Sequence, residues 1–187
     1  MQHPFLIGER LYLRAIEQED LSGPYFQWLN DAEVTRHMET GRFPNTQARM
    51  EAYLEARTAD GTDVMFMIVL KERDRSIGTI KLGCINWIHR HAEYGIMIGV
   101  KEVWGQGYGT EAGRLLLTYG FRRLNLHKVH LGVVADHAAA IRSYEKLGFR
   151  REGLLTEFLF VDGAYRDKLL MGVTGPAFFE AQKGTPS

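Results

Sequence analysis

The sequence reads Gly105-Gln106-Gly107-Tyr108-Gly109 at the junction between an apolar, strand-like segment and a segment with helical periodicity. Three glycines at alternate positions allow the backbone to approach a ligand closely. The first amide N–H groups of the following helix are unpaired donors at the positive end of its dipole, so this turn predicts a cradle for phosphate. It is not a P-loop, because no Gly-Lys-Ser/Thr occurs, and it lacks the spacing of a dinucleotide fingerprint.

The segments before this turn have the pattern of β-strands. Residues 64–70, 76–88 and 92–100 are rich in Ile, Val, Met and Tyr and are separated by polar or Gly turns. This pattern predicts consecutive antiparallel strands. Nearer the N-terminus, residues 10–14 alternate like a further strand. Three short helices are expected after it, at residues 17–29, 31–39 and 46–57, with Asp31 and Thr46 as N-caps.

The segments after the turn alternate between helix and strand. A helix with an apolar face at Ala112, Leu115, Leu116 and Tyr119 is followed by a strand at residues 128–134. A second helix, with an apolar face that includes Tyr144, is expected to be capped by Asp136 and ended by Gly148. Residues 149–160 and 164–173 predict a hairpin. The order β-α-α-α-β-β-β-α-β-α-β-β predicts a mixed α/β domain with helices on both faces of the sheet.

Composition sets limits on domain number and on partners. The chain has 187 residues, 45% of them hydrophobic and 25% charged, so we expect one domain over residues 1–182 and a disordered tail at 183–187. Lys plus Arg equals Asp plus Glu at 23 each, which argues against nucleic-acid and membrane partners. No apolar run could span a bilayer, and we expect a cytoplasmic protein. The single cysteine, Cys84, is expected to be a buried, inert thiol.

Two motifs at this spacing resemble the GNAT superfamily of acyl-CoA-dependent N-acyltransferases, and the resemblance extends from Arg10 to about Val173. The family's pyrophosphate motif, Arg/Gln-x-x-Gly-x-Gly/Ala, falls on residues 104–109. Its Tyr-Glu-Lys-Leu-Gly-Phe segment matches residues 144–149 at every position. The resemblance implies a mostly antiparallel sheet of about seven strands, in which the fourth and fifth strands (residues 92–100 and 128–134) splay apart.

The resemblance also implies acetyl-CoA as co-substrate. Its diphosphate would lie on the backbone amides of the Gly-rich turn and its pantetheine arm along the fourth strand, like an added strand. The implied cofactor-binding residues are Met97, Ile98, Gly99, Gly105, Gln106, Gly107, Tyr108, Gly109, Thr110 and His137. Two positions depart from the family. Trp104 replaces the usual Arg or Gln, and His137 replaces an Asn, so that its ring either bonds the cofactor or faces solvent.

Two residues are the candidates for catalysis. In the family, the phenol at the position of Tyr144 gives a proton to the departing thiolate. Some members carry a Glu on the fifth strand, but the matching position here is Gly132, so Glu93 or a water chain is expected to act as the base. Alternation places Glu93 on one face with Gly95 and Gly99, where missing side chains would leave room for a ligand.

We expect direct transfer within a ternary complex and no metal site. The histidines at 89, 91, 127 and 130 have no Cys or acid to complete a metal shell. The implied activity is transfer of acetyl from acetyl-CoA to a primary amine. The alternative is a non-catalytic acetyl-CoA-binding sensor or regulatory module. The partner would be a small-molecule amine or a protein N-terminal amine, and a homodimer is one assembly that the chain could form.

Three branches of the family leave the substrate open: ribosomal-protein N-terminal, polyamine and amino-sugar-nucleotide N-acetyltransferases. Residues 85–93 and 157–167 look like the polyamine branch, whereas residues 25–34 look like the amino-sugar type. Residues 1–60 hold ten acids against six Lys or Arg, which slightly favours a cationic acceptor. Arg36, Arg42 and Arg49 could equally grip a nucleotide diphosphate.

Overall fold

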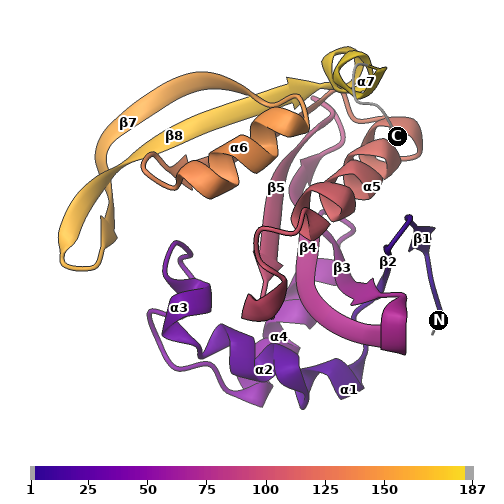
Figure 1. The fold of residues 1–187 in the computed structure, drawn as a ribbon, viewed down its shortest axis with the longest axis vertical. Coiled ribbons are helices and arrows are strands. Elements are labelled where there is room, and N and C mark those ends of the chain that lie inside the picture. The colour runs from indigo at the N-terminus through magenta and orange to yellow at the C-terminus, as the bar shows by residue number, and fades with distance from the viewer. Residues whose placement is uncertain (1–2, 184–187) are drawn as a thin grey trace.

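The computed structural model describes residues 3–183 and has one eight-stranded sheet with the order β1-β2-β3-β4-β5-β6-β8-β7 (Figure 1). The strands are β1 (Leu6–Ile7), β2 (Leu11–Ala15), β3 (Val64–Leu70), β4 (Arg75–Asn86), β5 (His91–Ile98), β6 (Lys128–Val134), β7 (Arg150–Val161) and β8 (Ala164–Thr174). Every neighbouring pair is antiparallel except β5 and β6, which run parallel. The mixed, mostly antiparallel sheet is therefore confirmed, and the two-residue β1 is the strand that the sequence pattern did not predict.

Seven α-helices and two 3₁₀ turns connect and follow the strands in the described part of the chain. They are α1 (Gln18–Leu21), α2 (Pro24–Leu29), α3 (Ala32–Thr35), α4 (Gln47–Thr58), η1 (Glu72–Asp74), η2 (Lys101–Val103), α5 (Tyr108–Arg122), α6 (Ala138–Lys146) and α7 (Gly175–Lys183). The expected helix 17–29 is split in two, because Gly23 and Pro24 start a new helix there. Asp31 and Thr46 cap α3 and α4 as predicted, each accepting backbone N–H groups.

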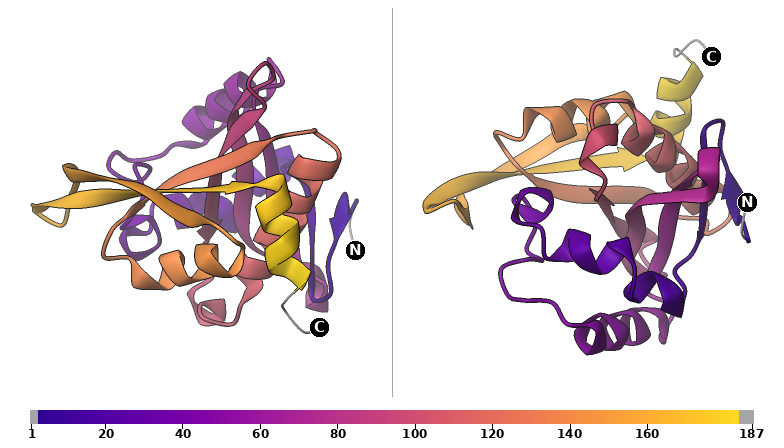
Figure 2. Two further views of the ribbon diagram at one scale, coloured as in Figure 1. Left: turned by 90° about the horizontal axis from the view of Figure 1, so that it is seen from above. Right: turned by 60° about the horizontal axis from the view of Figure 1, so that its bottom comes forward.

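Helices cover both faces of the sheet. Lys81 and Leu82 on β4 point to opposite faces, as neighbours on a strand must. The Lys81 ammonium donates to the Tyr53 hydroxyl of α4 at 3.2 Å, whereas Leu82 lies against Gly120 of α5. One face of the sheet is thus packed by α2 and α4, and the other by α5 and α6 (Figure 2).

The β7–β8 hairpin extends beyond the helices that cover the rest of the sheet (Figures 1 and 2). β7 is an edge strand, and most of its side chains are exposed. Two contacts hold the hairpin tip to the segment between α3 and α4. The Arg36 guanidinium pairs with the Asp162 carboxylate at 2.7 Å, and Arg42 donates to the carbonyl oxygen of Phe160 at 3.1 Å.

Four local expectations need correction or extension. Asp136 does not cap α6: His137 is the N-cap residue, and Asp136 instead faces Arg166 at 3.7 Å. Cys84 is exposed, because it adopts a positive φ of 51° at an irregularity in β4. Helix α7 was not predicted, and it includes Lys183, which was assigned to the tail; residues 184–187 lie outside the described part of the chain.

Between residues 3 and 183, no helix combines the length and the apolar character needed to cross a membrane.

Candidate active site

The Gly-rich turn has the backbone that its sequence predicts. Gly105 and Gly107 adopt φ angles of 74° and 83°, in the left-handed region that favours glycine. Gly107 is the N-cap of α5, and the first helical hydrogen bond runs from Glu111 N–H to Gly107 O at 3.0 Å. The N–H groups of the three residues between them therefore precede the helical ladder. Apart from Gly105 and its two chain neighbours, no described residue has a heavy atom within 4 Å of the position of a Cβ on Gly105, so the turn has the room and the donors for a diphosphate.

Arg10, at the start of β2, holds this turn from the side. Its Nη1 donates to Gln106 O at 3.0 Å, and its Nε pairs with the Glu111 carboxylate at 2.8 Å. Its guanidinium carbon also lies 4.4 Å from the centroid of the Tyr108 ring. The local sequence gave no signal for this residue, because its partners are about a hundred positions away.

Helix α6 is tied to the start of α5 and carries Tyr144 to the sheet. The hydroxyls of Thr110 and Ser143 are 2.9 Å apart, so the residue before Tyr144 contacts the first turn of α5. The Tyr144 ring packs against the rings of Tyr94 and Phe149, with centroid distances of 5.8 and 5.9 Å. Burial raises the pKa of Tyr144 to about 12, so its phenol keeps its proton at neutral pH.

Strands β5 and β6 separate beside Tyr94. Only three residue pairs join them, and Glu93 with His130 is the last pair before they part. Because β5 continues to Ile98 and β6 to Val134, the strand edges beyond that pair face one another across an opening. The splayed arrangement of residues 92–100 and 128–134 is thus present.

Three positions, Met97, Ile98 and Gly99, were expected to pair with pantetheine, and Ile98 alone has backbone groups that point into this opening. Gly99 N–H donates to Ile77 O at 2.9 Å on β4, and the Met97 carbonyl abuts Gly78 on the same strand. Alternate residues of a strand direct their N–H and C=O groups to opposite sides, so those of Ile98 face β6. The Ile98 carbonyl already accepts the Trp104 indole N–H at 2.8 Å.

Glu93 lies on the face expected for it, but the glycines on that face do not leave room for a ligand. A Cβ on Gly99 would overlap the ring of Trp28, and one on Gly95 would lie 3.1 Å from the Lys81 side chain. These glycines accommodate neighbouring side chains. The expectation of free space there is therefore wrong, although Glu93 itself is exposed.

The His137 ring lies against the ring of His37, which follows α3, with 4.2 Å between the centroids. Burial, and then the neighbouring His37, lowers the pKa of His137. The two histidines thus join the start of α6 to the segment between α3 and α4. At the start of α3, Asp31 and Glu33 pair with Lys101 at 3.0 and 2.8 Å.

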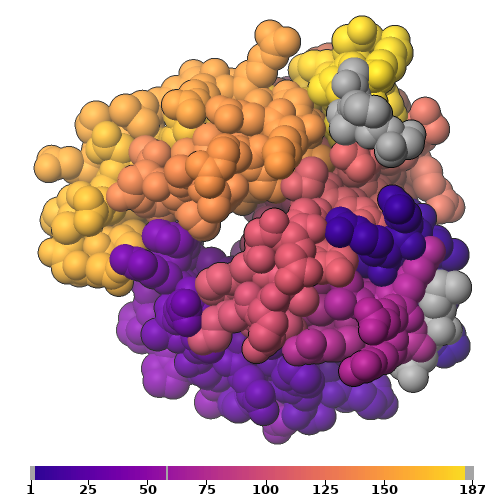
Figure 3. Space-filling view, viewed as in Figure 1, coloured from indigo at the N-terminus to yellow at the C-terminus, as the bar shows by residue number. Residues whose placement is uncertain are grey.

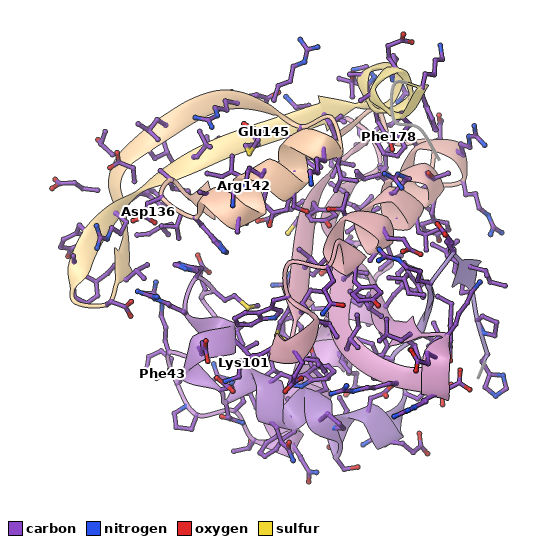
Figure 4. All side chains as sticks on the ribbon, viewed as in Figure 1. Phe43, Lys101, Asp136, Arg142, Glu145 and Phe178 are labelled. Carbon is purple, nitrogen blue, oxygen red and sulfur yellow. The ribbon has the colours of Figure 1, made fainter. Side chains whose placement is uncertain are left out.

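The contacts of His137 and Lys101 lie around an opening on the molecular surface, which is visible in the space-filling view. It lies between α6, the β7–β8 hairpin, the α3 segment and the segment that follows β5 (Figure 3). Asp136 and Arg142 lie on the α6 side of the opening, and Phe43 and Lys101 lie on the opposite side (Figure 4). A second ligand could approach the separated strands from here. Among residues 3–183, no three His, Cys, Asp or Glu side chains are grouped so that they could hold a metal ion.

Comparisons with known proteins agree with this geometry. Residues 10–150 match the acetyltransferase (GNAT) domain family. An uncharacterized N-acetyltransferase, p20, of Bacillus licheniformis is 35% identical over 155 residues, which cover 82% of this chain and 86% of that protein. Spermidine N(1)-acetyltransferase of Escherichia coli is 35% identical over 160 residues, covering 85% of this chain and 83% of that protein.

A comparison with solved structures also finds N-acetyltransferases. The crystal structure of spermidine N-acetyltransferase from Vibrio cholerae in complex with CoA and spermine superposes with a TM-score of 0.83 at 30% identity. The match covers 91% of this chain and 98% of that one. The chain therefore belongs to the GNAT family and is an acetyl-CoA-dependent N-acetyltransferase.

Proposed function

We propose that this enzyme acetylates a primary amine of a polyamine, in a ternary complex with acetyl-CoA. One observation carries the proposal: Glu93 and Tyr144 flank the same point of the sheet, where β5 and β6 part, from opposite faces. The exposed Glu93 carboxylate attracts a cationic amine to one side of that point. The Tyr144 phenol holds a proton on the other side.

The residues of the Gly-rich turn and of β5 are proposed to hold the cofactor. The N–H groups at the start of α5 would bind the diphosphate, with Gly105 and Gly107 giving it access. Ile98 N–H would bind the pantetheine arm, because it faces the opening. When bound, acetyl-CoA supplies a thioester whose carbonyl carbon accepts the amine nitrogen.

The chain's own residues would supply the proton transfers. A basic group on the Glu93 side of the opening removes a proton from the amine, which frees its lone pair for attack. Tyr144 delivers its proton to the leaving sulfur and recovers one from solvent afterwards. Strand pairing fixes the backbone position of Glu93, and the packing of the Tyr144 ring fixes the phenol.

The contacts of the arginines support a polyamine over a nucleotide sugar. Arg36 is paired with Asp162 and Arg42 with the Phe160 carbonyl, so both guanidinium groups already have partners at the hairpin tip. The relatives named as spermidine N-acetyltransferases support the same class of acceptor. A polyamine carries several ammonium groups, which suits an exposed carboxylate beside the point where β5 and β6 part.

The test is a panel of amines incubated with acetyl-CoA, with the released thiol followed colorimetrically. The panel would contain spermidine, spermine, a nucleoside-diphosphate amino sugar and a peptide with a free N-terminus. Spermidine or spermine should give the highest kcat/KM. Thiol release with only the amino sugar or only the peptide would reject the polyamine assignment, while the acetyltransferase activity would stand.

The assembly proposed here is a homodimer formed through the edge of β7. Among the described strands, β7 has a neighbour on one side only, and the hairpin exposes Leu154, Leu155, Phe158, Phe160 and Tyr165. A long apolar edge strand is a template for pairing with a second copy. Light scattering after size-exclusion chromatography should give twice the mass of the chain. Leu154→Asp should give a monomer, whereas Ile88→Asp, on the exposed β4–β5 turn, should not.

A further inference from the structure

Glu93 has a titratable neighbour on β6. His130 is its register partner in the parallel β5–β6 pair, the last pair before the two strands separate. Directly paired residues of neighbouring strands place their side chains on the same face of a sheet, within reach of each other. The imidazole of His130 and the carboxylate of Glu93 therefore lie side by side at the closed end of the opening.

The strand on the other side of His130 has no side chain directly opposite this ring. Its register partner on β8 is Gly172, and the next residue on the same face of β6 is Gly132. The long side chains of Glu152 and Lys168 pass over Gly172 and Gly132, respectively. His130 itself is partly exposed, so its ring can exchange a proton with solvent.

The charged groups that face His130 come from three strands. Glu93 and His91 lie on β5, and the His91 ring centroid is 5.5 Å from that of His130. Lys128 lies on β6 and pairs with Glu152 of β7 at 2.7 Å. Burial lowers the pKa of His130 most; Glu93 and Glu152 raise it, and His91 and Lys128 lower it. The net direction is downward, so His130 is neutral at pH 7 and has a free lone pair.

We propose that His130 is the proton acceptor of the acetyl transfer and that Glu93 holds the cationic amine beside it. This inference rests on the proposed function. One N–H bond of the ammonium breaks and its proton moves to the imidazole nitrogen, while the nitrogen lone pair forms the bond to the acyl carbon. The carbon–sulfur bond breaks, and the sulfur takes the Tyr144 proton. The acylated nitrogen then loses its second proton to solvent, which leaves a neutral amide. His130 then releases its proton to solvent.

A neutral imidazole suits this task better than a carboxylate. An ordinary imidazole is a stronger base than an ordinary carboxylate, and a general base works best when its pKa is close to the working pH. A carboxylate is the better ligand for an ammonium ion, because its charge is permanent at neutral pH. The two side chains thus divide between them the binding and the deprotonation of the amine.

The first experiment compares wild type with His130→Gln, and with His127→Gln as a matched control on an exposed histidine three residues away. His130→Gln should lower kcat/KM for spermidine by about 10²-fold or more. In wild type, kcat/KM should fall at acidic pH as His130 is protonated, and this acidic limb of the pH profile should be absent in His130→Gln. Acetyl-CoA affinity, measured by calorimetry, should be unchanged in both variants. If His130→Gln keeps the wild-type kcat/KM and the wild-type acidic limb of the pH profile, the proposal is overturned and the proposed function stays intact.

The second experiment separates the roles of the two residues and does not depend on His130→Gln folding. Glu93→Gln removes a charge that raises the pKa of His130, so the acidic limb should move to lower pH while persisting. The His130 resonance in an NMR titration of the free protein should shift in the same direction. Loss of the limb in Glu93→Gln would make Glu93 the base and reject the proposal. Wild type that releases no thiol with any amine would reject the proposed function, and this inference with it.

Discussion

The ring of Tyr144 meets the ring of Tyr94 edge-on, with 5.8 Å between centroids and 81° between the ring planes. Tyr94 follows Glu93 on β5, and neighbouring side chains of a strand point to opposite faces. This contact therefore places the phenol of α6 and the carboxylate of β5 at the same level of the sheet. Burial also raises the pKa of the Tyr94 hydroxyl well above its usual value, so both phenols stay protonated.

Gly107→Glu should abolish the stabilisation that acetyl-CoA gives the protein. The substitution places a bulky anion at the start of α5, where the diphosphate would lie. A ligand at about 100 times its Kd stabilises the native state by about 2.7 kcal/mol, and thermal unfolding with and without acetyl-CoA measures this shift. Gly61→Glu is the matched control, since Gly61 has a similar φ of 68° and open space around it. An undiminished shift in Gly107→Glu would reject the phosphate cradle.

Arg10→Ala should weaken acetyl-CoA binding although Arg10 is not proposed to touch the cofactor. The side chain fixes the turn through Gln106 O and Glu111, and its loss frees the turn to sample conformations that do not bind. Calorimetry should give a higher Kd, with a larger entropic penalty. Arg73→Ala, which removes an arginine whose side chain is 87% exposed, should bind as wild type does. Equal Kd values for both variants would show that the turn is rigid without Arg10.

The sequence predicted the parts of the site that depend on local backbone geometry. Gly105, Gly107 and Gly148 have positive φ angles, and glycine at such positions is a requirement that one sequence reveals. Asp31 and Thr46 likewise cap helices through contacts within three residues. Arg10 could not be found in this way, because its role comes from contacts with a turn about a hundred residues away.

Other expectations failed because packing decided the outcome. Gly99 suggested free space, but Trp28 from α2 fills it. Helix α7 begins with Gly175 and Pro176 and is held by tertiary contacts, such as that of Phe178 with Phe121 at 5.5 Å. A single sequence does not show which distant side chain will occupy a glycine gap, or which terminal segment will find an apolar partner.

Gly99→Ala should destabilise the protein, whereas Gly95→Ala should have little effect. Both glycines are on one face of β5, but a Cβ at 99 would overlap the buried Trp28 ring, and a Cβ at 95 would meet the flexible Lys81 chain at 3.1 Å. Overpacking of this kind costs about 1–3 kcal/mol. Urea denaturation of both variants measures the difference. A loss of stability of equal size in the two would show that the cost comes from the strand backbone and not from Trp28.

Stability should fall as the pH drops below the ordinary histidine value of 6.5. The pKa of His137 is lowered, first by burial and then by His37 and Arg36, with Asp136 opposing them. The unfolded chain then binds more protons than the native state between the native pKa and 6.5, so unfolding becomes easier as pH falls through that window. Urea denaturation at pH 7.5 and 5.5 should show a smaller loss in His137→Asn. His127→Asn, at an exposed position, should keep the full loss.

Tyr144→Phe should give a stable, CoA-binding, slow enzyme. The substitution keeps the ring and its contacts with Tyr94 and Phe149, so thermal stability and acetyl-CoA affinity should change little. Loss of a positioned general acid typically lowers the rate by about 10² to 10⁴-fold. Steady-state kinetics should show the decrease in kcat, with little change in the KM for acetyl-CoA.

The same variant gives a second readout that a packing defect would not produce. An acyl thioester whose thiol has a lower pKa needs less protonation as it leaves, so the deficit of Tyr144→Phe should shrink with such a substrate. Burial raises the pKa of Tyr144 to about 12, so the phenol stays protonated throughout the neutral range and the deficit should not depend on pH there. Full activity of Tyr144→Phe with acetyl-CoA would make Tyr144 a packing residue, and the leaving sulfur would then take its proton from water.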